Sequence, residues 1–118
     1  MGNFRFQNLD IWKISIEIAD GLFTISDELE EKRLYRFAEQ LRGAGMSMSN
    51  NIAEGSGSNS SKDFRNFLNF ARRSAFENAN ILILLHKRAL IAQNTLDHYL
   101  DELDLPCRKI TSFQRTLS

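Results

Sequence analysis

The sequence contains few residues that end helices or cross-link a chain. Among 118 residues there are six glycines, one proline (Pro106) and one cysteine (Cys107). A single cysteine excludes an internal disulfide and argues against a cysteine-based zinc site. An all-β domain with many short hairpins needs more turn-forming glycine and proline than this chain has. Long helices joined by a few loops are therefore expected.

Neither sign of charge is in excess, because 15 lysines and arginines balance 15 aspartates and glutamates. This balance excludes a uniformly basic nucleic-acid coat but leaves room for a local basic surface. No apolar run approaches the roughly 20 residues that a membrane helix requires. The length and the free thiol fit one domain, residues 1–118, in a reducing compartment. We predict a soluble cytoplasmic protein with no membrane partner.

Patterns that carry catalysis or metal binding are missing from the sequence. A di-iron bundle needs Glu-x-x-His, but Ile83 and Thr95 stand three residues before the two histidines, His86 and His98. Cys107 has no histidine nearby, and no Gly-Lys-Ser/Thr phosphate loop occurs. We predict a protein that is not an enzyme, with no cofactor, no metal and no small-molecule substrate.

Apolar residues recur every three or four positions along most of the chain, which is the period of a helix. This pattern predicts an all-α fold, an antiparallel up-and-down four-helix bundle with short connections. The expected helices cover residues 8–30, 32–54, 61–92 and 94–117.

Glycine and proline refine these expectations. Gly55 is expected to end the second helix in the left-handed conformation. Gly43 and Gly45 lie within a regular helical pattern, which suggests that another helix approaches closely there. Pro106 predicts a kink or a break in the fourth helix near residues 104–106, because it has no N–H and clashes with the preceding turn.

Two helices are apolar on more than one side. The first carries two apolar stripes, and the third is apolar nearly all round between residues 79 and 85, with Phe76 and Ile83 off its main side. A small four-helix bundle buries mainly one side of each helix. We therefore predict that copies of this chain associate into a homo-oligomer.

One string of residues resembles a known family. The string combines Gln40-Leu41-Arg42, the run Asn51-Ile52-Ala53-Glu54-Gly55, and Asp63-Phe64, Phe67-Leu68, Ala71, Ser74 and Glu77. It is similar to the four-helix-bundle family linked to intervening sequences in 23S ribosomal RNA, whose members are also called S23-type ribosomal proteins. The resemblance implies a ring, a homopentamer, and no established activity. Many members have glycine where this chain has Arg73.

A more distant resemblance is to the accessory proteins of diversity-generating retroelements. In that group a basic pentameric barrel is linked to binding of nucleic acid and reverse transcriptase. This chain, with no net charge, is much less basic than such a role suggests.

The polar motif residues allow two interpretations. Gln40, Asn51, Glu54 and Gly55 either contact a ligand or nucleic acid, or they support the structure. We favour the structural interpretation, in which Asn51 and Glu54 form hydrogen bonds across helices or to the next loop. Buried polar groups without partners cost about 1–3 kcal/mol, so such groups are usually paired.

Charge is distributed unevenly along the chain. Residues 1–31 hold seven acidic and two basic residues, whereas residues 32–93 hold ten basic and four acidic ones. The best candidates for phosphate contact are Lys62, Arg65, Arg72 and Arg73. Alternatively, these cations form an ordinary solvated surface, or pair with the acidic first helix of the same or a neighbouring subunit. The nearby Phe64, Phe67 and Phe70 lie at helical spacing and are expected in the core or an interface.

These observations lead to two functional hypotheses. The first is a homo-oligomer that binds RNA, DNA or a nucleoprotein partner through a basic surface on its central helices. The second is an oligomeric scaffold for protein interactions with no affinity for nucleic acid.

Overall fold

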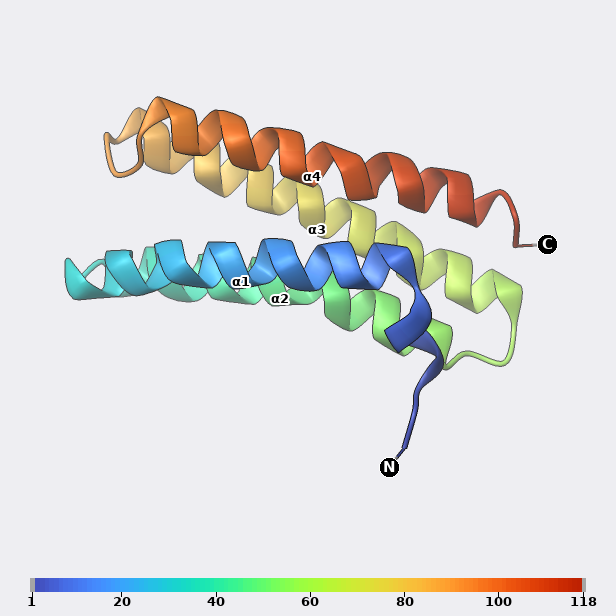
Figure 1. Ribbon diagram of the computed structural model, residues 1–118. Coiled ribbons are helices and arrows are strands. Elements are labelled where there is room, and N and C mark those ends of the chain that lie inside the picture. The colour runs from blue at the N-terminus through green and yellow to red at the C-terminus, as the bar shows by residue number, and fades with distance from the viewer. Residues whose placement is uncertain (1, 118) are drawn as a thin grey trace.

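The chain folds into four long α-helices that follow a short 3-10 helix (Figure 1). The computed structural model describes residues 2–117, and no strand occurs in this part of the chain. Successive helices run in opposite directions, so the predicted antiparallel up-and-down bundle is confirmed. The elements are η1 (Arg5–Asn8), α1 (Asp10–Glu31), α2 (Tyr35–Ser56), α3 (Ser61–Lys87) and α4 (Gln93–Gln114).

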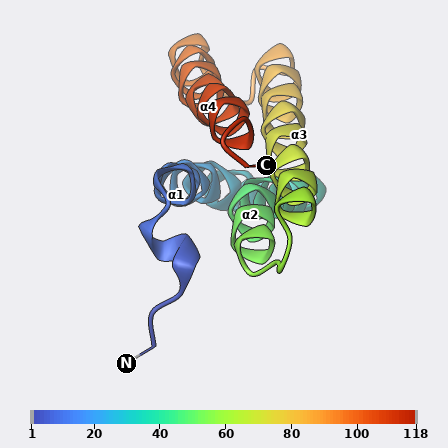
Figure 2. The ribbon, with the colours of Figure 1, turned by 90° about the vertical axis from the view of Figure 1, so that its right-hand side faces the viewer.

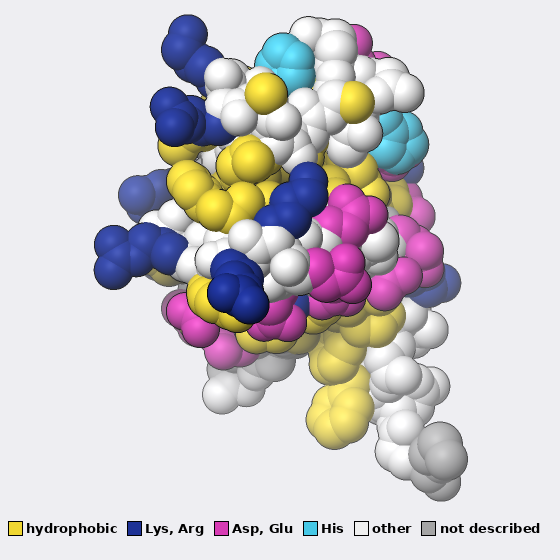
Figure 3. All heavy atoms as spheres, turned by 90° about the vertical axis from the view of Figure 1, so that its left-hand side faces the viewer, with side chains coloured by type: hydrophobic (Ala, Val, Ile, Leu, Met, Phe, Trp, Pro, Cys, Tyr) yellow, Lys and Arg dark blue, Asp and Glu magenta, His cyan; other side chains and the backbone are white. Residues whose placement is uncertain are grey.

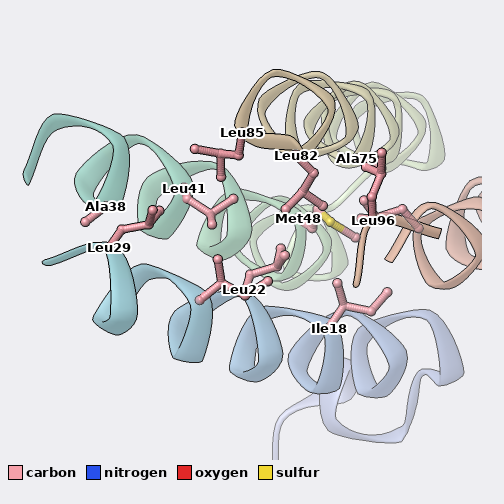
Figure 4. Packing of buried hydrophobic residues seen from close by; sticks show 12 residues of the cluster. Ile18, Leu22, Leu29, Ala38, Leu41, Met48, Ala75, Leu82, Leu85 and Leu96 are labelled. Atoms are coloured by element: carbon pink, nitrogen blue, oxygen red, sulfur yellow. The ribbon is translucent and has the colours of Figure 1, made fainter. Parts of the chain in front are cut away.

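Apolar side chains from all four helices form the core. The larger cluster is centred on Leu22 of α1, Leu41 and Met48 of α2, and Leu82 of α3, all fully buried (Figure 4). A second cluster lies toward the chain termini and includes Ile52, Phe64, Leu68 and Ile110. Burial of this apolar surface is the main force that holds the helices together.

The four helices are not packed equally. Helix α2 packs closely against both α1 and α3, whereas α4 lies along α3 and makes the fewest contacts with α1 (Figure 2). The buried residues of α4 are Leu96, Leu103, Pro106 and Ile110. Because α4 buries so little of its surface, grooves remain open on both of its sides.

The glycines of α2 have different roles from those predicted. Gly55 does not end the helix: α2 continues to Ser56, and no described glycine has a positive φ. A Cβ atom at Gly55 would lie 2.6 Å from Cβ of Phe67 and 2.9 Å from Cδ1 of Phe64, so the glycine permits the close approach of α3. Nothing in the described chain lies within 4 Å of a Cβ at Gly43, and Gly45 makes ordinary contacts with Leu22.

The end of α1 agrees with the prediction to within one residue, whereas α3 ends earlier than predicted. Helices α1 and α3 both stop with a left-handed residue that is not glycine, Arg33 at φ 63° and Ala89 at φ 60°. In each turn the N–H of the next residue reaches back to a carbonyl five residues earlier, as Leu34 does to Leu29 and Leu90 to Leu85. Helix α3 therefore ends at Lys87, five residues before the predicted end.

The fourth helix is not broken at its proline. Helix α4 is continuous from Gln93 to Gln114, with Pro106 inside it and buried. Of the two alternatives predicted near residues 104–106, a kink or a break, the break does not occur, since the chain is helical on both sides of Pro106. None of the helices between residues 2 and 117 is long and apolar enough to cross a membrane.

Candidate nucleic-acid interface

Two of the predicted phosphate-binding residues lie on the outer surface of α3. Lys62 and Arg73 are both exposed and are eleven residues apart, which is close to three helical turns. They therefore project from the same side of the helix, about 16 Å apart along its axis at 1.5 Å per residue. Asn66 and Asn69 are exposed between them. The four residues, which we call the outer α3 surface, are opposite the buried Phe64 and Leu68.

Arg65 lies on the side of α3 that faces α4. Its Nη1 donates a hydrogen bond of 2.6 Å to the carbonyl oxygen of Leu117, and Nε2 of Gln114 donates one of 3.1 Å to the carbonyl of Arg65. These bonds fasten the end of α4 to α3. The Arg65 guanidinium is therefore engaged within the chain, and its geometry separates it from Lys62 and Arg73.

Arg72 lies on the same side as Arg65, over a groove between α3 and α4. Its guanidinium is 5.1 Å from the ring centroid of Phe76, and its Nε is buried without a hydrogen-bond partner in the described chain. The groove has a volume of about 470 Å³ and is also lined by Cys107 and Arg108. Burial raises the pKa of the Cys107 thiol, and the positive charge of Arg72 opposes this increase. The four candidate cations thus form two pairs rather than one patch.

The acidic residues of α1 pair with other cations. Arg42 of α2 contacts Asp27 at 2.6 Å and Glu30 at 3.1 Å, and Lys109 of α4 contacts Asp10 at 2.7 Å. The hydrogen bond to Asp27, followed by the one to Glu30, raises the pKa of Arg42. Between residues 2 and 117, no ion pair links the acidic residues of α1 to any of the four candidate cations.

Asn51, the first residue of the Asn-Ile-Ala-Glu-Gly run, takes part in a polar link between α2 and α3. Its Nδ2 donates to the carbonyl and the hydroxyl of Ser47, at 2.8 and 3.1 Å. The Ser47 hydroxyl lies 2.8 Å from the Ser74 hydroxyl, which in turn donates to the carbonyl of Phe70 at 3.0 Å. Asn51 therefore supports the helix contact through Ser47 rather than by a direct bond across the helices.

The other polar motif residues do not join this network. Gln40 and Glu54 are exposed, and within residues 2–117 their side chains form no hydrogen bond. The hydrogen bond predicted for Glu54, across the helices or to the next loop, is therefore wrong in the described chain.

A buried amide makes the direct contact that the sequence analysis missed. Asn78 of α3 is fully buried, and its Nδ2 donates to the carbonyl of Ala44 on α2 at 2.8 Å and to that of Ser74 at 2.9 Å. Its Oδ1 has no partner in the described chain. The signal in the sequence that could have identified Asn78 is its position as an asparagine on the apolar side of the third helix.

Several large apolar side chains of α3 remain exposed in the single chain. Phe64 lies in the core, whereas Phe70 is 46% exposed, Phe76 59% and Ile83 48%. Figure 3 views the end with the α1–α2 and α3–α4 turns and shows apolar side chains at the surface between the two helix layers. In this view lysines and arginines gather toward the left, and aspartates and glutamates toward the centre and right.

No group of three or more potential metal ligands occurs in the part of the chain that the structure describes. Nothing in the geometry of the described residues assigns a metal site.

Comparisons with known proteins support the fold and the family. One solved structure, a protein of unknown function from the S23 ribosomal protein family of Bacteroides thetaiotaomicron VPI-5482, superposes with a TM-score of 0.83. It is 24% identical in sequence, and the match covers 88% of this chain and 97% of that one. No curated protein is significantly similar. The profile of the 23S rRNA-intervening sequence proteins matches residues 7–112. The chain belongs to the 23S rRNA-intervening sequence protein family.

Proposed function

We propose that this protein acts without catalysis, as a homo-oligomer that binds nucleic acid through the outer α3 surface. The observation that carries the proposal is the pair Lys62 and Arg73, two exposed cations on one side of a helix. Neither forms an ion pair within residues 2–117, so both are free to contact phosphate. Exposed asparagines between them add hydrogen-bond donors, which commonly accompany phosphate contacts.

Self-association would make this small surface effective. Two cations on one chain bind phosphate weakly, but a ring repeats them and converts later contacts into intramolecular ones. The exposed Phe76 and Ile83 support association, because they are seven residues apart and therefore project from the same side of α3. Large contiguous apolar patches on a protein surface often mark a contact with another protein. The family resemblance points to a pentameric ring.

One observation favours the second candidate function, an oligomeric scaffold without affinity for nucleic acid. Arg65 is bound to Leu117, and Arg72 is stacked on Phe76. Only half of the candidate cations therefore remain free for phosphate. A scaffold would use the same apolar surfaces for association and would leave the outer α3 surface solvated.

Fluorescence anisotropy with a labelled single-stranded oligonucleotide from 23S rRNA separates the two functions. We expect binding at micromolar protein in 50 mM salt and a steep loss of affinity toward 200 mM, because phosphate contacts release counterions. The double variant Lys62→Ala/Arg73→Ala should weaken binding and reduce the salt dependence. A matched control, Lys13→Ala/Lys32→Ala, removes the same charge from exposed positions at α1 and should bind as the wild type does. No binding at 50 mM salt would support the scaffold instead.

Light scattering tests the association on which the proposal depends. The mass should be a multiple of 13.6 kDa, and Phe76→Ser/Ile83→Ser should lower it. Circular dichroism checks that the variant remains helical. A wild-type mass of one chain would contradict the proposal.

A further inference from the structure

A polar hollow with an aromatic wall lies where α2 meets α3, next to the outer α3 surface. The open hollow has a volume of about 460 Å³. It is lined by Ser47 and Asn51 of α2 and by Phe70, Arg73, Ser74 and Glu77 of α3. One of its residues, Arg73, also belongs to the proposed phosphate-binding pair.

The aromatic wall of the hollow is the ring of Phe70, which packs against a second ring. The ring of Phe70 packs edge-to-face against Phe67, with the centroids 6.2 Å apart at an interplanar angle of 84°. Phe67 in turn lies against Gly55, where the missing side chain lets it approach α2. Phe70 is therefore positioned by its neighbours although nearly half of it is exposed. An ordered, exposed aromatic ring beside a cation is the arrangement that stacks unpaired bases.

The hydrogen bonds of the hollow leave an acceptor free. Each serine hydroxyl has one proton, and that of Ser74 goes to the carbonyl of Phe70. Ser47 must then donate to Ser74, and Asn51 donates through Nδ2 to Ser47. This chain of donors uses the hydroxyl protons and the amide N–H, while Oδ1 of Asn51 forms no hydrogen bond within residues 2–117. The carboxylate of Glu77, which only accepts hydrogen bonds, lines the same hollow.

We propose that this hollow binds one unpaired nucleotide, with its base stacked on Phe70 and its phosphate at Arg73. The acceptors, Oδ1 of Asn51 and the carboxylate of Glu77, receive the exocyclic amino group of the base. Cytosine, adenine and guanine carry such a group. Uracil instead has a carbonyl oxygen at the ring position where cytosine has its amino group. The site therefore prefers cytosine to uracil, two pyrimidines of similar size. This inference rests on the proposed function, since binding of a nucleic-acid strand to the outer α3 surface would place its nucleotides next to the hollow.

Binding of labelled rC10 and rU10 tests the base preference directly. We expect rC10 to bind several-fold more tightly than rU10 in low salt. Phe70→Ala should weaken binding of both by at least about fivefold, which is the lower end of the effect of removing a stacking aromatic. Asn51→Ala/Glu77→Ala should remove the preference for rC10 while leaving rU10 bound. Tyr35→Ala, which removes another exposed aromatic at the start of α2, serves as the matched control and should change neither affinity.

The outcomes separate this inference from the function on which it rests. If Lys62→Ala/Arg73→Ala weakens binding but Phe70→Ala does not, or if rC10 and rU10 bind equally, the hollow is not a base site and the proposed function stands. If neither oligonucleotide binds, both proposals fail. If Phe70→Ala lowers the mass measured by light scattering but leaves the oligonucleotide affinity per chain unchanged, Phe70 is a contact between copies and the inference is overturned.

The sugar provides a second check on the same site. The acceptors of the hollow form hydrogen bonds with the base and not with the sugar. The preference for cytosine over uracil should therefore not require a 2′-hydroxyl group. We expect dC10 to bind more tightly than dU10 by a similar ratio. A preference confined to the ribose form would contradict recognition through the exocyclic amino group.

Discussion

A Cβ atom at Gly55 would lie 2.6 Å from the Cβ atom of Phe67, closer than two such atoms pack in proteins. Both atoms belong to the least flexible part of their residues, so the contact is relieved only if α2 and α3 move apart. The same glycine is buried and lies in the last turn of α2, before the helix ends at Ser56. Its role is to allow two helices to approach, not to end one of them.

We predict that Gly55→Ala destabilises the protein by about 1–3 kcal/mol, which is typical of an extra methyl group forced into a packed core. Urea unfolding followed by circular dichroism measures this change. Gly43→Ala is the matched control in the same helix, because its added Cβ would meet nothing within 4 Å in the described chain. The control should gain up to about 1 kcal/mol, since alanine favours helix over glycine. Equal effects at the two positions would contradict the assigned roles.

Gly21 makes the corresponding contact between α1 and α4. A Cβ atom at this position would clash with the hydroxyl end of Tyr99, which packs over the glycine. We predict that Gly21→Ala loosens α4 from α1, the pair of neighbouring helices with the least contact. Hydrogen exchange should show faster exchange in the first half of α4 and little change in α2. Gly21→Ala/Tyr99→Phe, which removes the hydroxyl, should recover part of the loss, and no recovery would contradict the assigned clash.

Tyr99 also makes stability depend on alkaline pH. Burial, followed by the nearby carboxylates of Glu102, Asp20 and Glu28, raises the pKa of the Tyr99 phenol above 10. The folded state thus favours the neutral phenol. The contribution of Tyr99 to the free energy of unfolding is complete below the pKa of about 10 that the phenol has in the unfolded chain. It is lost as the pH rises through the pKa in the folded chain. We predict that the urea midpoint falls more steeply above pH 10 in the wild type than in Tyr99→Phe.

The comparison in alkali needs one precaution, because burial also raises the pKa of the Cys107 thiol. Both proteins should therefore carry Cys107→Ala, so that thiol ionisation does not contribute. Absorbance near 295 nm follows tyrosine ionisation directly. Parallel midpoints from pH 8 to pH 11 would show that Tyr99 ionises equally well in the folded and unfolded chain.

Periodicity alone was sufficient to predict the four helices, their order and their antiparallel arrangement. It placed the end of α1 within one residue of its observed position but extended α3 five residues too far, because the left-handed residue that ends α3 is Ala89 and not a glycine. Left-handed conformations at residues other than glycine are stabilised by the surrounding turn, which leaves no mark on the local sequence. The short helix η1 was missed for a similar reason, since four residues do not reveal a period.

The sequence indicates how the four candidate cations pair on α3 but not which pair is exposed. Spacing places Lys62 with Arg73 and Arg65 with Arg72, but it does not say which side of α3 is covered by α4. The structure places α4 beside Arg65 and Arg72 and engages both with neighbouring groups. Phe70 was expected in the core or an interface, and the structure excludes the core, because its side chain is 46% exposed in the single chain.

The buried amide of Asn78 provides the last prediction. Its Nδ2 joins α3 to the carbonyl of Ala44 on α2, and its surroundings offer acceptors to this nitrogen but no donor to Oδ1. Asn78→Ala should cost about 1–3 kcal/mol, because it leaves the carbonyl of Ala44 without this donor in the core. Asn78→Asp has nearly the same shape but places a charge against two carbonyl oxygens, so it should cost more at pH 7. Protonation supplies a donor again, and the difference between Asn78→Asp and the wild type should narrow as the pH falls. Urea unfolding of the three proteins at pH 7 and pH 5 measures this order. If Asn78→Asp is as stable as Asn78→Ala at both pH values, the amide N–H does not hold α2 to α3.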